Sequence, residues 1–163
     1  MSEAAPIQIR PAEPGAEAAI GALSQLASVT GAPPWAIVHS IEEETAWARS
    51  VIEQPDPAMA LLVAVDAEVD AGGGGLVLGF VTVLPVTDVS GHRHGHIASI
   101  AVAPDAEGRG IGTALLAAAE AWCRAQGFSD VTLHVYPGNE RARHVYERAG
   151  FELEWHRLRK ELG

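Results

Sequence analysis

The stretch that decides the fold is residues 97–116, IASIAVAPDAEGRGIGTALL. An apolar run ends at Val102, Pro104 follows, and a glycine-rich turn leads into helical spacing that begins near Gly110. At such a junction the first N–H groups of the helix have no intrahelical partner, and the helix dipole adds positive potential. The stretch therefore predicts a strand, a turn and a helix whose N-terminus binds an anion, most simply a phosphate or pyrophosphate.

The turn is not one of two familiar phosphate-binding loops. Gly108, Gly110 and Gly112 lack side chains where a ligand would approach the backbone. A P-loop needs Lys and then Ser or Thr directly after its last glycine, but Thr113 and Ala114 follow here. The alternating glycine spacing also differs from the GxGxxG pattern of dinucleotide-binding proteins.

The rest of the chain alternates between helical and strand periodicity. Helices are expected at residues 16–28, 40–55, 110–126 and 139–149, and strands at 7–10, 60–66, 76–84, 96–102 and 131–136, with a last strand or two in 151–162. Ser40 and Glu43 are spaced as in a capping box, and Gly127 stands at the position of a C-cap glycine. The four glycines at 72–75 predict a flexible hairpin loop.

This order of elements predicts an α/β (α+β) fold. We expect a single domain over residues 1–163, with a central mixed, mostly antiparallel sheet of six to seven strands and about four helices. The 163 residues are enough to bury a proper core. Hydrophobic residues make up 48% and charged residues 20%, which is typical of a globular protein and not of a disordered one.

Composition and charge argue against several classes of partner. The net charge is −10, with 21 acidic and 11 basic residues, which disfavours nucleic acid and anionic membranes and mildly favours a cationic acceptor. No apolar run approaches the ~18 residues of a membrane-spanning helix. The first ten residues lack a basic region followed by an apolar one, and Cys123 has no second cysteine to pair with. We therefore expect a cytoplasmic protein.

Two motifs together resemble the GCN5-related N-acetyltransferase (GNAT) superfamily. Residues 107–112, EGRGIG, are similar to the family's Arg/Gln-x-x-Gly-x-Gly/Ala motif. Residues 139–151, NERARHVYERAGF, are similar to its Asn-x-x-Ala-x-x-x-Tyr-x-x-x-Gly-Phe motif. The resemblance is sharp over residues 97–152, the expected cofactor-binding core, whereas residues 12–57 match only as two helices.

The resemblance implies that acetyl coenzyme A (acetyl-CoA) is the co-substrate, without a metal ion. Strand backbone groups would hold the pantetheine arm like an added strand, and amides of the turn would hold the pyrophosphate. Asn139 would hydrogen-bond the cofactor and Tyr146 would face the thioester sulfur. The implied cofactor-binding residues are Ile100, Ala101, Val102, Glu107, Gly108, Arg109, Gly110, Ile111, Gly112, Thr113, Asn139 and Tyr146.

One position departs from the family pattern. Glu107 stands where the family usually has Arg or Gln. A carboxylate beside a poorly solvated pyrophosphate is unfavourable because the two negative charges repel. We expect the Glu107 side chain to turn outward and Arg109 to supply the missing positive charge.

The implied reaction is direct attack of a primary amine on the thioester. The backbone N–H of Val102 is the expected donor to the oxyanion, and Tyr146, with an ordinary pKa of ~10, is the expected general acid. The base is open: His94 and His96 lead into the cofactor strand and could take the amine proton directly or through water, with His96 preferred. Asp88 and residues 42–44 are weaker candidates, for binding the acceptor.

Plainer interpretations stand beside these roles. Tyr146 lies on an apolar helical stripe and suits a core position, and Asn139 suits an N-cap. His92, His94 and His96 alternate as metal ligands can, but glycines interrupt the run and no cysteine or acidic ligand accompanies it. We therefore predict no metal site and expect a polar hairpin lip near the acceptor.

The acceptor is a small-molecule or peptide amine that the sequence does not identify. A different acyl-CoA as donor is one alternative, and a non-catalytic module that senses coenzyme A is another. Family habit suggests a homodimer.

Overall fold

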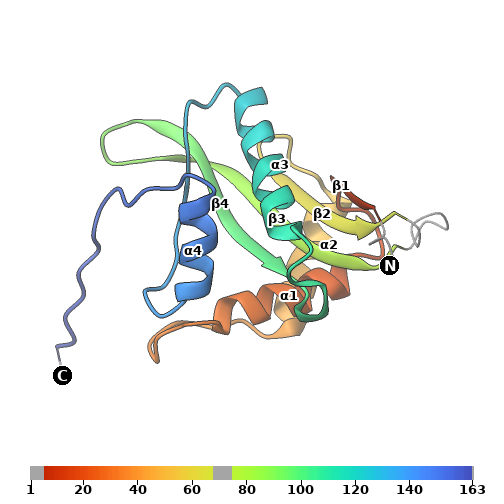
Figure 1. The fold of residues 1–163 in the computed structure, drawn as a ribbon, viewed down its shortest axis with the longest axis horizontal. Helices are drawn as coiled ribbons and strands as arrows, with labels where there is room; N and C mark the ends of the chain where they lie inside the picture. The colour runs from red at the N-terminus through yellow and green to blue at the C-terminus, as the bar shows by residue number, and fades with distance from the viewer. Residues whose placement is uncertain (1–5, 68–74, 163) are drawn as a thin grey trace.

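The computed structural model describes residues 6–67 and 75–162, which form one mixed sheet with helices on both faces (Figure 1). The strands are β1 Ile7–Pro11, β2 Ala60–Asp66, β3 Val77–Thr87, β4 Arg93–Val102 and β5 Val131–Leu133. The helices are α1 Glu17–Val29, α2 Ile41–Glu53, α3 Ile111–Ala125 and α4 Glu140–Arg148, with a short 3₁₀ turn at Pro104–Ala106. The predicted hairpin loop at 72–75 lies outside the described residues except for Gly75.

The sheet has the strand order β1-β2-β3-β4-β5. The first four strands pair antiparallel with their neighbours. β5 pairs parallel with β4, and this pairing covers only Gly95 to Ile97 opposite Val131 to Leu133. β4 therefore continues through residues 98–102 without a described strand on its outer side.

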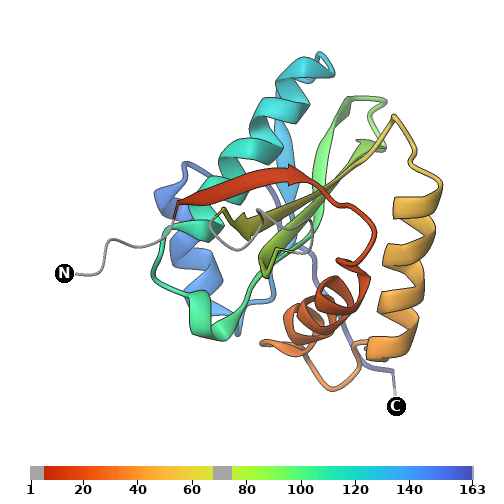
Figure 2. The ribbon, with the colours of Figure 1, turned by 90° about the vertical axis from the view of Figure 1, so that its right-hand side faces the viewer.

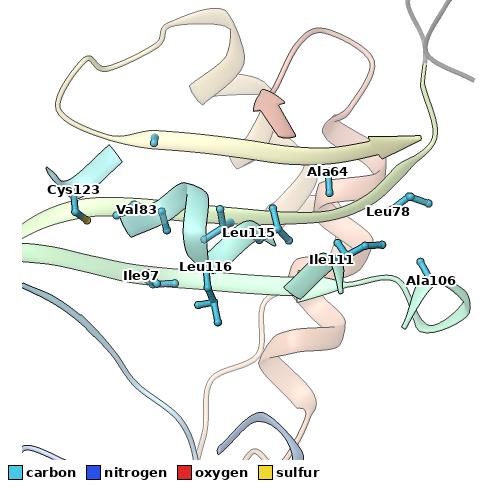
Figure 3. Packing of buried hydrophobic residues seen from close by; sticks show 12 residues of the cluster. Ala64, Leu78, Val83, Ile97, Ala106, Ile111, Leu115, Leu116 and Cys123 are labelled. Atoms are coloured by element: carbon cyan, nitrogen blue, oxygen red, sulfur yellow. The ribbon is translucent and has the colours of Figure 1, made fainter. Parts of the chain in front are cut away.

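Apolar side chains on the two faces of the sheet build two core layers. On one face, Ile111, Leu115 and Leu116 of α3 pack toward the strands that carry Val83 and Ile97 (Figure 3). On the other face, α1 and α2 cover a second cluster, and Figure 2 shows these two helices side by side. The second cluster contains Ala16, Ile20, Leu23, Ala48, Leu61, Val63, Val65 and Phe80. Because both faces are covered, β2 is a continuous apolar run and not an alternating one.

β4 contains a bulge that shifts its pairing with β3. Thr82 pairs with Ser99, whereas the next residue, Val83, pairs with Ile97. Ala98 is therefore the extra residue, and its side chain is exposed. A bulge of this kind changes which backbone groups point to each side of the strand beyond it.

The local signals in the sequence were confirmed. The capping box exists, since Ser40 Oγ accepts a bond of 3.2 Å from Glu43 N–H and Ser40 N–H donates to Glu43 Oε2 at 2.7 Å. Gly127 follows α3 with φ +82°. All four helices lie within two residues of their predicted bounds. None of the helices in the described part of the chain is both long and apolar enough to cross a bilayer.

The predicted strand count was wrong. The sheet of the described residues has five strands and not six to seven, because residues 151–162 form no strand. In addition, β5 ends at Leu133 instead of Tyr136. A strand needs a neighbour for its backbone groups. The C-terminal segment instead crosses toward the α1–α2 connection, where the Arg159 guanidinium carbon lies 4.7 Å from the centre of the Trp35 ring.

Close packing of α3 on β4 generates a stability prediction. A Cβ atom added to Gly95 would overlap Sγ of the buried Cys123. We expect Gly95→Ala to lower the free energy of unfolding by about 1–3 kcal/mol, measured by chemical denaturation. In a Cys123→Ala background the obstructing sulfur is gone, so the same substitution should cost clearly less. An equal cost in both backgrounds would contradict this account of the packing.

Candidate active site

The outer edge of β4 presents unpaired backbone groups beyond Ile97. Ala103 N–H donates to the Leu78 carbonyl across the sheet at 2.8 Å. Successive residues of a strand direct their backbone groups to opposite sides, so Ala101 also faces β3, whereas Ile100 and Val102 face outward. No described strand pairs with β4 on that side past Ile97. An extended ligand with amide groups can therefore add to this edge.

The glycine turn leads from this edge to an uncapped helix start. Gly108 and Gly110 have φ values of +78° and +77°, which L-residues rarely adopt. Gly110 is the N-cap of α3 and supplies no side-chain bond, and the helical ladder begins with Ala114 N–H donating to the Gly110 carbonyl at 3.0 Å. The amides of residues 111–113 thus have no intrahelical partner, and the first turn carries no acidic residue. The turn suits an anion held by backbone amides.

The two charged residues of the turn are held by other elements. Glu107 Oε2 lies 2.6 Å from Nη1 of Arg141 on α4. Arg109 Nη2 lies 3.8 Å from Asp66 Oδ2 at the end of β2. The cation beside Glu107 is therefore Arg141, which the sequence reasoning missed. Its position two residues after Asn139, within the second motif, was the available signal.

α4 carries the two expected side chains of the second motif. Asn139 is the N-cap of α4, and its Oδ1 accepts a bond of 3.2 Å from Ala142 N–H. The half-buried Tyr146 packs against the core, with its ring centre 6.0 Å from that of Phe151. Burial raises the pKa of the Tyr146 phenol, so the group is protonated at neutral pH.

A wide groove gathers nearly all of the expected cofactor residues. Its walls come from β4, the glycine turn, α3, β5, α4 and the segment after α4, and it extends to α1 and the start of α2. Of the expected residues only Arg109 does not line it; those that do are Ile100, Ala101, Val102, Glu107, Gly108, Gly110, Ile111, Gly112, Thr113, Asn139 and Tyr146.

His96 lines the groove and is the candidate base with the best-defined side-chain contacts there. Its Nδ1 lies 2.8 Å from Thr132 Oγ1, and its ring centre is 4.8 Å from that of His134. Burial, with smaller effects from His134 and His94, lowers the pKa of His96 and favours the neutral imidazole.

Asp88, Glu43 and Glu44, which were candidates for binding the acceptor, make hydrogen bonds within the chain. Asp88 Oδ1 accepts a bond of 2.6 Å from the Ser90 hydroxyl, which lowers the pKa of Asp88. Glu43 closes the capping box of α2, and Glu44 Oε2 accepts a bond of 2.8 Å from the Ser24 hydroxyl. These contacts hold loops and helices together.

Comparisons with known proteins agree with this geometry. A model of the acetyltransferase (GNAT) family matches residues 25–151. Over 136 residues the chain is 38% identical to mycothiol acetyltransferase of Propionibacterium freudenreichii, covering 80% of this chain and 40% of that protein. Over 58 residues it is 43% identical to mycothiol acetyltransferase of Rhodococcus jostii, covering 36% of this chain and 19% of that protein. The chain thus spans two fifths or less of the length of these curated relatives.

Solved structures share the fold over nearly the whole chain. A putative acetyl transferase from Pyrococcus furiosus superposes with a TM-score of 0.70 at 25% identity, covering 96% of this chain and 100% of that one. An aminoglycoside N-acetyltransferase in complex with CoA superposes with a TM-score of 0.74 at 18% identity, covering 100% of this chain and 99% of that one.

Proposed function

Because this chain belongs to the acetyltransferase (GNAT) family, we propose that it transfers an acetyl group from acetyl-CoA to a primary amine. The observation that carries the proposal is the continuity of two backbone features. The unpaired outer edge of β4 ends at Val102, and the uncapped N-terminus of α3 lies beside it, since a Cβ added to Gly112 would be 3.8 Å from Cγ2 of Val102. A ligand with an amide-containing arm and a pyrophosphate matches both features in that order.

Different residues of the chain bind different parts of the cofactor. Outward backbone groups of Ile100 and Val102 hydrogen-bond the pantetheine arm. The backbone of Ala101 pairs with β3 instead, so Ala101 contributes only its small side chain to this part of the binding site. Amides of residues 108–113 bind the pyrophosphate. Asn139 Oδ1 is occupied by the helix cap, so the amide nitrogen is the group left to donate to the cofactor.

Catalysis relies on positioning, on a backbone N–H that stabilises the oxyanion, on Tyr146 as the acid and on His96 as the base. Holding the amine against the thioester can lower the activation free energy by up to ~7–11 kcal/mol. An outward N–H of β4, from Val102 or Ile100, stabilises the negative charge that develops on the carbonyl oxygen. Tyr146 donates its proton to the leaving sulfur as negative charge develops there, and its raised pKa keeps the phenol protonated at neutral pH.

The position of His96 limits how it acts as a base. Six residues of strand, 96 to 102, separate it from Val102. At ~3.3 Å per residue this is about 20 Å, so His96 cannot contact an amine held beside Val102. Ile100 is four residues away, about 13 Å by the same measure, so direct contact is excluded there too. We therefore propose that His96 takes the proton through a chain of water molecules, with the carbonyl held nearer Ile100.

The acceptor is proposed to be a cationic small molecule or peptide amine. Glu43 and Glu44 at the start of α2 line the groove, and the net charge of the chain is −10. Both features attract a protonated amine before it loses its proton. Relatives named mycothiol acetyltransferase and aminoglycoside N-acetyltransferase indicate small-molecule acceptors to test first.

A matched pair of glycines tests the pyrophosphate site. Gly110 and Gly127 stand at opposite ends of α3 with φ values of +77° and +82°, and an added Cβ would meet nothing within 4 Å at either. We expect Gly110→Ala and Gly127→Ala to cost a similar ~1–2 kcal/mol of stability, because both force a side chain into the left-handed region. Only Gly110→Ala should weaken coenzyme A binding by calorimetry, at least about tenfold. Equal coenzyme A affinities in the two variants would mean that the pyrophosphate does not bind at the N-terminus of α3.

The Arg141–Glu107 pair tests the unusual acid of the first motif. Arg141→Gln leaves the Glu107 carboxylate without its cation beside the turn, so coenzyme A affinity should fall about three- to tenfold. Adding Glu107→Gln should restore most of that loss. Arg143→Gln is the control, since Arg143 lies 3.8 Å from Glu147 on the same helix. If the double variant binds no better than Arg141→Gln, charge repulsion is not the cause.

The acid role of Tyr146 is tested by removing its hydroxyl. Tyr146→Phe keeps the ring packed against Phe151, so folding and coenzyme affinity should change little, while kcat should fall ~10-fold or more. The measurement is free-thiol release from acetyl-CoA with a library of amines, run in parallel with a panel of other acyl-CoAs. Tyr136→Phe, which also lines the groove, is the matched control. Unchanged turnover in Tyr146→Phe would rule out the acid role, and turnover with none of the amines would favour a coenzyme A sensor.

A further inference from the structure

Two histidines and one carboxylate meet where β4 and β5 begin. His92 immediately precedes β4, His94 is its second residue, and Asp130 immediately precedes β5. One potential ligand atom from each lies within 4.8 Å of the other two. None of the three has a role in the acyl transfer proposed above.

The contacts within this cluster leave a ring nitrogen unsatisfied. His92 Nε2 lies 2.8 Å from Asp130 Oδ1, and the rings of His92 and His94 stack with centres 5.6 Å apart. His94 is only 7% exposed, and its buried Nδ1 has no hydrogen-bond partner among the described residues. A buried polar atom without a partner requires an explanation, and a bound ion is the one that also fits the neighbouring His92 and Asp130.

We propose that His92, His94 and Asp130 bind a divalent transition-metal ion, with zinc as the best match. Two imidazoles and a carboxylate form a nitrogen- and oxygen-rich set that zinc accepts in tetrahedral sites, with water as the fourth ligand. Zinc bonds of ~2.0–2.1 Å place neighbouring donors about 3.3 Å apart. The side chains of His92 and Asp130 are 48% and 43% exposed, so both can rotate to close the remaining separation.

The ion would add a further link between two strands whose backbone pairing is short. β4 and β5 pair over only three residues, and Gly95 N–H adds one bond of 3.1 Å to the Asp130 carbonyl. The three ligands stand directly before this pairing, so the ion would lie at the end of the β4–β5 pairing that is remote from the open edge of β4. The sequence argument excluded a metal because no acidic ligand accompanied the histidines. The fold supplies that ligand from 38 residues further along the chain, the separation between His92 and Asp130.

The test is zinc binding to the full chain without an affinity tag. We expect calorimetry to show about one zinc ion per chain, and cobalt(II) to give the intense visible absorption of a tetrahedral site. At zinc 100-fold above the dissociation constant, the unfolding temperature should rise by about 5–10 °C. His92→Ala and Asp130→Asn should each weaken zinc binding at least about tenfold. His144→Ala, which removes an exposed histidine of α4 outside the cluster, should leave zinc affinity unchanged.

Two results would overturn the proposal. One is the absence of zinc binding at millimolar concentration. The other is the same zinc affinity in His92→Ala and Asp130→Asn as in the parent chain. If the cluster is only an ion pair, Asp130→Asn will lower the unfolding temperature without zinc, and zinc will shift neither protein. These outcomes do not depend on acetyltransferase activity, so the metal site and the proposed function can fail separately.

Discussion

Pairing between β4 and β5 stops after Ile97 and Leu133, and the groove follows from that stop. Backbone N–H and C=O groups that lose a strand partner must find another, from water or from a ligand. The outer edge of β4 is therefore a row of donors and acceptors held rigid by β3 on its other side. A ligand that adds to this edge binds to a prepared strand and does not have to order one.

The bulge at Ala98 and the packing of α3 set the orientation of the outer edge of β4 relative to the N-terminus of α3. The extra residue changes the alternation so that Ile100 and Val102 face outward. Gly79 lets β3 and β4 approach α3 closely, since an added Cβ would lie 2.8 Å from the Ala101 carbonyl oxygen and 3.1 Å from Leu115. The core thus sets the position of the uncapped amides relative to the open strand.

Charges around the turn are neutralised locally in a chain that is acidic overall. Arg141 holds the Glu107 carboxylate, and Arg109 lies beside Asp66. In the proposed function, the turn depends on its backbone amides for the anion, and Arg141 limits the repulsion from Glu107. Glu107 thus has a cation beside it at a position where the family usually has Arg or Gln.

What the sequence by itself determined is local in the chain. Helical period, the capping box at Ser40, the glycine turn and the cap at Asn139 each depend on residues a few positions apart, so spacing alone predicted them. Tertiary structure decided the strand count, the partner of Glu107 and the meeting of His92 with Asp130. Those features join segments tens of residues apart, and pattern within one segment carries no information about which distant segment lies beside it.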